Sequence, residues 1–383
     1  MDFQLNDEQQ FLRQTVRDFA AKELAPKAKE VDEQARIPES TWQKMAAAGL
    51  MGLPFPEEFG GAGADAVSVA LAIEEVARAC GSTALSYAAH LGLGSAPLAM
   101  FGTQEQKERF LKPAAEGRHL AAFGLTEAHS GSDAGSSKTT AHREGGEWVI
   151  NGSKMWITNA ADAGHMIATA VTDKSKGKRG ISAFIIPKGT PGVEFGKPEH
   201  KMGLRGSSTH AISFDSVRIP AENLLGAENE GFIQFLKVLD GGRIGIGAMA
   251  IGLGVAAMEA SIAYAREREA FGQPIGAFQS ISNMIADMAT ELDAARLLVL
   301  RAATLKDQGK PFTNEAAMGK LFASEASERA CRNAIQIHGG YGYSAEFPVE
   351  RFYRDTRLLT IGEGTSEILR LVISRNVLGP LEK

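Results

Sequence analysis

The spacing of apolar residues changes twice along this chain, and that change restricts the fold more than any other feature. Up to about residue 118, apolar side chains recur at helical spacing, beginning after the capping-box pair Asn6 and Gln9. Residues 119–226 instead show a period of two, with turn dipeptides at short intervals, which is typical of strands. Helical spacing then returns. We therefore predict an α+β multidomain protein with a helical, a β and a second helical domain in that order.

The predicted domains are an N-terminal all-α domain (1–118), a middle β-barrel or β-sandwich-like domain (119–226) and a C-terminal four-helix-bundle domain (227–383). Several domains suit a chain of 383 residues, because single cores stop growing beyond roughly 250–300 residues. In the middle domain, Asn151-Gly152 between two apolar runs predicts a hairpin with a two-residue turn. In the last domain, apolar residues spaced by three and four predict bundle packing, and Thr313 is expected to cap a helix.

Composition excludes several classes of protein. The chain is 44% hydrophobic and 23% charged with a net charge of −5, so we expect no binding to nucleic acid. Its two cysteines, Cys80 and Cys331, lie in apolar helical stretches and predict buried thiols rather than disulfides or a metal site. We recognise no apolar run of membrane-spanning length and no signal peptide, so a cytoplasmic location without membrane contact is expected.

One carboxylate, Glu363, stands between two glycines near the end of the chain. The run before it, 357–361, is apolar enough to be buried, and Thr365 or Ser366 can cap the helix that follows. Burial raises the pKa of a carboxyl group, so a turn of this kind can hold a general base. A capping turn with an exposed glutamate is the alternative that this stretch leaves open by itself.

Five short motifs follow one another along the chain. They are Thr-Glu-Ala-His-Ser-Gly-Ser-Asp (126–133), Trp-Ile-Thr-Asn (156–159), Lys-Met-Gly-Leu-Arg-Gly-Ser-Ser-Thr (201–209), Gln-Ile-His-Gly-Gly (336–340) and Ile-Gly-Glu-Gly-Thr-Ser-Glu (361–367). In this order they resemble the acyl-CoA dehydrogenase family, over essentially the whole chain. The resemblance implies non-covalently bound FAD and oxidation of an acyl-CoA thioester to its trans-2-enoyl-CoA. In that reaction a glutamate takes the α-proton and flavin N5 receives the β-hydride.

The resemblance places the family's catalytic base on Glu363, whose own N–H would polarise the thioester carbonyl together with a flavin hydroxyl. Some relatives carry the base at a position that corresponds to Gly242, which has no carboxylate. The residues matched to FAD are Phe123, Leu125, Thr126, Ser132, Trp156, Ile157, Thr158, Thr365 and Glu367. Those matched to the FAD of a neighbouring subunit, or to contacts of that kind, are Arg268, Phe271, Gln279, Gln336, Gly339 and Gly340. Those matched to the acyl-CoA are Ser132, Asp240, Arg243 and Gly364.

Residue types alone leave alternatives open for several of these positions. Trp156 also fits an ordinary core position, and Arg268 fits a solvated helix face. Asp240 and Arg243 lie three apart on one helix and could form an intrahelical ion pair.

Two departures from the family pattern stand near the predicted site. Ala128 replaces a frequent proline, which leaves the rigidity of that loop in doubt, and Gly362 replaces a frequent tyrosine. Loss of the ring at Gly362 predicts space beside the base and a pocket that accepts a wider or branched acyl group. By resemblance the enzyme would be a homotetramer (a dimer of dimers) that passes electrons to an electron-transfer flavoprotein. The alternatives are an acyl-CoA oxidase on the same scaffold and a flavin-binding relative that does not dehydrogenate.

Overall fold

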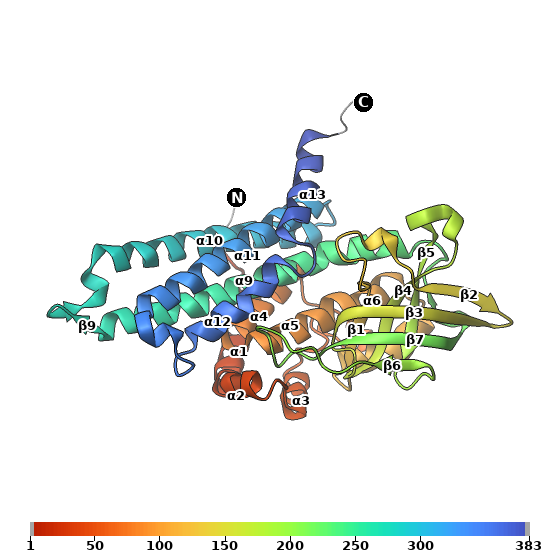
Figure 1. The fold of residues 1–383 in the computed structure, drawn as a ribbon, viewed down its shortest axis with the longest axis horizontal. Coiled ribbons are helices and arrows are strands. Elements are labelled where there is room, and N and C mark those ends of the chain that lie inside the picture. Colours follow the sequence, from red (N-terminus) through yellow and green to blue (C-terminus); the bar gives the residue numbers. More distant parts are fainter. Residues whose placement is uncertain (1–3, 380–383) are drawn as a thin grey trace.

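The computed structural model describes residues 4–379, so the outermost residues of the predicted terminal domains lie outside the described range. Figure 1 shows a β-sheet at one end of the long axis and long helices that extend to the other end. The N-terminal helices pack along one side of these long helices and against the sheet. The predicted order of a helical, a β and a helical domain is confirmed.

The N-terminal part is helical, as its apolar spacing predicts. Its first helix begins at the expected capping box, in which the Gln9 N–H donates to Asn6 Oδ1 over 2.8 Å and the Asn6 N–H donates to Gln9 Oε1 over 3.2 Å. A π-helical segment (His90–Ser95) interrupts the helical run. The helices are α1 (Asp7–Glu23), α2 (Ala28–Glu33), α3 (Glu39–Ala47), α4 (Ala66–Ala79), α5 (Gly81–Ala89), α6 (Ala96–Phe101), α7 (Gln104–Gln106) and α8 (Lys112–Ala115).

The middle part is an 8-stranded sheet with the strand order β6-β7-β3-β2-β4-β5-β8, and β1 pairs in parallel with β4. Trp148, Ile150 and Phe184 are among the buried side chains of its own core. The strands are β1 (Leu120–Gly124), β2 (Thr140–Glu144), β3 (Glu147–Thr158), β4 (Ala163–Val171), β5 (Ile181–Pro187), β6 (Val193–Phe195), β7 (Thr209–Pro220) and β8 (Leu224–Leu225).

The predicted hairpin turn at Asn151-Gly152 was wrong. Strand β3 runs straight through this dipeptide, and the chain reverses at Gly145-Gly146 between β2 and β3. Gly152 has φ +146°, and a Cβ there would lie 2.6 Å from the Cα of Thr139. The glycine therefore allows close approach of a neighbouring segment, which is the other common use of glycine within a strand.

The C-terminal part packs its long helices against one another and against α4. The predicted apolar stripe is buried at Met288, Leu292, Ala295 and Val299 of α10. The elements are α9 (Gly231–Glu267), β9 (Glu269–Ala270), β10 (Gln273–Pro274), α10 (Gln279–Asp307), α11 (Thr313–His338), α12 (Val349–Thr356) and α13 (Ser366–Leu378).

Two expectations about this part need correction. Thr313 does not cap α11: it is the first helical residue, and its hydroxyl donates to Asp240 Oδ2 over 2.5 Å. The expectation that no apolar run reaches membrane-spanning length was also wrong, because α9 has both the length and the apolar composition to span a bilayer. Most of its apolar window is buried inside the protein, as in the core helix of a bundle.

Candidate functional site

Glu363 lies in the turn that leads into α13. The predicted cap is present, because the hydroxyl of Thr365 accepts a hydrogen bond from the Ile368 N–H over 3.2 Å. Glu363 has φ +54° and Gly364 has φ +105°. A non-glycine residue held at positive φ costs on the order of 1–3 kcal/mol, and such residues cluster at functional sites.

The carboxyl group of Glu363 points into the protein. Its Oε2 atom is buried and has no hydrogen-bond partner within the described chain. Burial raises the pKa of Glu363 to about 7, and the nearby charges of Lys320 and Arg243 oppose that rise. The alternative of an exposed glutamate on a capping turn is therefore excluded.

Gly242 of α9 leaves the space that the Glu363 carboxyl occupies. A Cβ at Gly242 would lie 2.0 Å from Glu363 Oε2 and 3.0 Å from its Cδ. A side chain at this position and the carboxyl of Glu363 therefore exclude each other. The sequence shows only that Gly242 carries no carboxylate, whereas the structure shows why a glycine is needed there.

Asp240 and Arg243 form the intrahelical ion pair that the sequence left open, with 2.7 Å between Asp240 Oδ1 and Arg243 Nη1. This ion pair leaves one hydrogen-bond donor of Arg243 unused, because the buried Nε of Arg243 has no partner within the described chain. Burial lowers the pKa of Arg243 despite the attraction of Asp240 and Glu363. A buried N–H donor without an acceptor, close to Glu363, fits a site that receives a polar ligand.

Lys320, which the sequence motifs did not single out, lies on α11 and is fully buried. Its Nζ donates to the backbone carbonyl of Gly364 over 2.7 Å. Burial lowers the pKa of Lys320 to about 8, against the attraction of Glu363. The available sequence signal was a lysine among alanines that face the core, such as Ala316, Ala317 and Ala323.

The predicted FAD residues of the β domain lie at the ends of β1 and β3. Trp156 is 56% exposed with φ +62°, so the alternative of a core tryptophan is excluded. Ile157 points the other way, is 2% exposed and packs in the core of the sheet, so only its backbone is available to a cofactor. The half-buried residues of this set are Phe123, Leu125, Thr126 and Thr158, and Ser132 is exposed.

A buried ion pair that the sequence analysis also missed supports the loop after β1. Lys154 Nζ donates to Glu127 Oε1 over 2.8 Å and to the Leu125 carbonyl over 3.1 Å. The Glu127 carboxylate also accepts the N–H groups of Lys138 and Thr139. These bonds tie both ends of the loop that carries Ser132 to the strand that carries Trp156.

The residues matched to a neighbouring subunit's FAD lie at the far end of the long helices (Figure 1). Arg268 ends α9 and stacks its guanidinium on Tyr341, 5.8 Å from the ring centroid, beside a pocket of about 590 Å³. At about 1.5 Å per helical residue, roughly 37 Å of α9 separate Arg268 from Arg243. The exposed residues of this set are Arg268, Phe271, Gln279, Gln336, Gly339 and Gly340. Within one chain, this set and the Glu363 site are thus separate surfaces.

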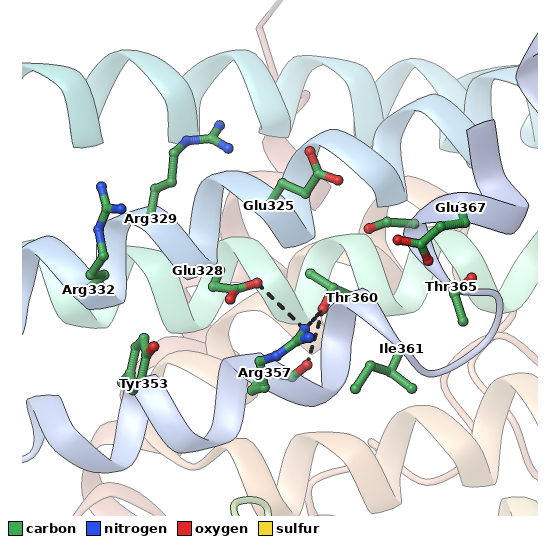
Figure 2. A pocket seen from close by; sticks show the side chains of 11 residues that line it. Glu325, Glu328, Arg329, Arg332, Tyr353, Arg357, Thr360, Ile361, Thr365 and Glu367 are labelled. Carbon is green, nitrogen blue, oxygen red and sulfur yellow. Dashed lines mark hydrogen bonds and ion pairs between the residues drawn. The ribbon is translucent and has the colours of Figure 1, made fainter.

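A polar pocket lies between α11, α12 and the start of α13, and its volume is about 410 Å³. Figure 2 shows the side chains that line it. Thr365 and Glu367 line it, and Arg357 lies 3.7 Å from Glu328 across it. Ser366 also lines it, and its buried Oγ has no partner within the described chain. Free N–H groups at a helix start favour an anion, so this end of α13 fits the phosphates of a dinucleotide.

The donors and surfaces present fit FAD. An exposed indole at a strand end suits a flat ring system, and the unpartnered Ser366 hydroxyl at a helix start suits a phosphate chain. Within residues 4–379, no three His, Cys, Asp or Glu side chains are grouped to hold a metal ion.

Family models cover nearly the whole chain. They are the acyl-CoA dehydrogenase N-terminal domain at residues 6–118, the middle domain at residues 122–217 and the C-terminal domain at residues 229–378. The chain belongs to the acyl-CoA dehydrogenase family, which is a family of oxidoreductases.

Two named relatives align over nearly their full length. The protein "Probable acyl-CoA dehydrogenase YngJ" of Bacillus subtilis (strain 168) is 58% identical over 99% of this chain and 100% of its own. The short-chain specific acyl-CoA dehydrogenase of Clostridium acetobutylicum is 45% identical over 98% of this chain and 100% of its own.

Three solved structures share the fold. Butyryl-CoA dehydrogenase from Megasphaera elsdenii is 43% identical, with a TM-score of 0.97 over 99% of this chain and 100% of that one. A chain in the structure described as the electron transferring flavoprotein of Acidaminococcus fermentans is 46% identical. Its TM-score is 0.98 over 99% of this chain and 100% of that one. An acyl-CoA dehydrogenase complexed with FAD from Bacillus anthracis is 37% identical, with a TM-score of 0.92 over 98% of this chain and 67% of that one.

Proposed function

We propose that this protein is an FAD-dependent dehydrogenase of short acyl-CoA thioesters, with Glu363 as the base that takes the α-proton. The observation that carries the proposal is the buried, unpartnered Glu363 Oε2, whose pKa is raised to about 7. The names of the short-chain specific relative and of butyryl-CoA dehydrogenase support a short acyl chain. The chemistry that FAD supplies when bound is acceptance of the hydride from the substrate β-carbon.

Glu363 is suited to proton abstraction from a carbon that is only weakly acidic. A base whose pKa lies near the working pH combines a substantial anionic fraction with good proton affinity. Among residues 4–379 no donor bonds to the unpartnered oxygen, so it is free to receive the proton. The backbone N–H of Glu363 is the proposed donor to the thioester carbonyl, where negative charge develops.

The cofactor would be held by residues from two regions of this chain. Trp156 and Thr158 are the proposed wall and hydrogen-bond donor for the ring system, and the start of α13 at Thr365 and Ser366 would receive the phosphates. The FAD bound to the Bacillus anthracis relative supports this choice of cofactor.

The set around Arg268 lies too far from these regions to serve the same site, so we propose that it contacts FAD bound to another copy. That geometry needs at least two copies of the chain, and the resemblance to the family extends the proposal to a homotetramer. Size-exclusion chromatography with light scattering tests it, and a monomer that retains FAD would contradict it.

We expect kcat/KM to rise as the pH increases through about 7. The anionic form of Glu363 is the reactive base, and its pKa in the free protein is about 7. Below that pH, the rate should fall by about tenfold per unit, because kcat/KM follows the free enzyme's ionisation. Initial rates with a short acyl-CoA between pH 5.5 and 9 measure this profile. A flat profile through pH 7 would contradict the assignment.

Gly362 leaves room beside the base. The atoms nearest to a Cβ there would belong to Leu358, at 3.7 Å or more, which is ordinary van der Waals contact, so substitution is sterically allowed. We expect the unaltered protein to oxidise a branched short acyl-CoA such as isobutyryl-CoA as well as butyryl-CoA. Gly362→Tyr should reduce the rate ratio of branched to straight substrate by about tenfold, a typical pocket effect. Strict preference of the unaltered protein for straight chains would rule this out.

One experiment separates the candidate functions. Purified protein with bound FAD is mixed anaerobically with a panel of acyl-CoA thioesters, and loss of the yellow flavin absorbance is followed. Bleaching that an electron-transfer flavoprotein reverses supports the dehydrogenase. Stoichiometric hydrogen peroxide in air would assign an acyl-CoA oxidase instead, and no bleaching with any thioester would assign a flavin-binding relative that does not dehydrogenate.

A further inference from the structure

Lys320 is a fully buried charge that the proposed reaction does not use. It lies in the middle of α11 and is 0% exposed. Burial of an ammonium group destabilises the fold unless ion pairs or hydrogen bonds offset the loss of hydration. Its hydrogen bond runs to the Gly364 carbonyl, 2.7 Å away, on the residue that directly follows Glu363.

That hydrogen bond holds a strained turn. Glu363 and Gly364 both have positive φ, at +54° and +105°, so the peptide groups on either side of them have unusual orientations. Such a turn persists only when its surroundings fix it. The cap at Thr365 fixes the side towards α13, and Lys320 fixes the Gly364 carbonyl from the opposite helix.

The charge of Lys320 also acts on Glu363. The charged groups of the surrounding elements are Asp240 and Arg243 on α9, Lys306 on α10, Lys320 and Glu325 on α11, and Glu367 on α13. Arg243 is paired with Asp240 at 2.7 Å. In contrast, no carboxylate among the described residues lies within 4.0 Å of Lys320 Nζ. Lys320, like Lys306, therefore has no close carboxylate among the described residues, and of the two cations that lower the pKa of Glu363, Lys320 has the larger effect and Arg243 the smaller.

We propose that Lys320 is a positioning residue that fixes the Glu363 turn through the Gly364 carbonyl and keeps the Glu363 carboxyl available as an anion. This role rests on the proposed function of Glu363 as the base. It adds a second residue to the motif, from a helix more than forty positions earlier in the chain.

Two substitutions separate the charge of Lys320 from its hydrogen bond. Lys320→Met removes both, and Lys320→Gln keeps an N–H donor without the charge. We expect the apparent pKa in the kcat/KM profile to rise in both variants by roughly one unit or more, the scale of an opposite charge at close range. Activity should recover at high pH better in Lys320→Gln than in Lys320→Met.

The exposed Lys310→Met serves as the control for loss of one positive charge, and its profile should match that of the unaltered protein. A uniform loss of activity without a shift of the profile would assign a purely structural role and overturn the proposal. Failure of both Lys320 variants to fold would do the same.

A second measurement does not depend on turnover, so it separates this proposal from the proposed function. The melting temperatures of Lys320→Met and of the double variant Lys320→Met/Glu363→Gln are compared from pH 5 to 9. A carboxyl whose folded pKa is raised contributes stability that is lost as the pH rises through that pKa. Without Lys320, the pKa of Glu363 in the folded protein should lie above 7. The difference in melting temperature between the two variants should therefore keep changing as the pH rises above 7. A constant difference above pH 7 would overturn the action of Lys320 on Glu363, whether or not the protein oxidises acyl-CoA.

Discussion

Glu363→Gln should lower turnover by roughly 10²–10⁴, the usual scale for loss of a general base, while FAD and acyl-CoA still bind. Glutamine has nearly the shape of glutamate, so it can occupy the space beside Gly242 without accepting a proton at neutral pH. The remaining activity should no longer rise through pH 7, because the group with a pKa of about 7 is gone. Stopped-flow measurement of flavin bleaching gives the rate of the chemical step directly.

The same substitution has a predicted effect on stability. Burial raises the pKa of Glu363, so ionisation of this carboxyl at pH 8 lowers the free energy of unfolding. Glu363→Gln should therefore melt at a higher temperature than the unaltered protein at pH 8, and this difference should shrink towards pH 5. Glu363→Asp is the matched control, because it keeps the carboxyl group on a side chain that is one methylene shorter. Its turnover should lie between that of Glu363→Gln and that of the unaltered protein. Near-normal turnover of Glu363→Gln would show that the base is elsewhere.

Local signals in the sequence predicted local structure well. The capping box at Asn6 and the cap at Thr365 depend on side chains within three residues of a helix start, so they are visible in the sequence. The change of apolar period predicted the order of helical and β domains. This signal is also local, because each period reflects which side of a single helix or strand is buried.

Features that depend on distant segments were not predictable in this way. Gly152 looked like a turn residue because nothing nearby in the sequence shows that Thr139 approaches it. Lys320 looked like an ordinary helix lysine, since its partner at Gly364 comes much later in the chain. Glu127 and Lys154 are likewise paired only by the fold.

The candidate base was found by resemblance, and the structure added its electrostatic setting. The sequence could show a glutamate between glycines. It could not show that Oε2 of this glutamate lacks a hydrogen-bond partner in the described part of the chain, or that Lys320 and Arg243 oppose the effect of its burial on the pKa. These are properties of three segments that meet only in the folded chain.

Gly242→Ala should abolish most activity with little loss of stability. The added Cβ would lie 2.0 Å from Glu363 Oε2, which is far inside van der Waals contact. The clash falls on the far end of a flexible side chain, so the carboxyl can move away and the fold can persist. A base that is misplaced by about 1 Å can lose on the order of 10² in rate, and we expect at least that fall in kcat.

The neighbouring Gly241→Ala is a matched control on the same helix. Its added Cβ would meet only Lys306 Nζ at 3.6 Å, an ordinary contact, so turnover should stay within about twofold of the unaltered protein. The melting temperatures of both variants should remain close to that of the unaltered protein. Equal losses of activity in the two variants would point to a general disturbance of α9, whereas loss in Gly242→Ala alone would tie activity to the position of one carboxyl oxygen.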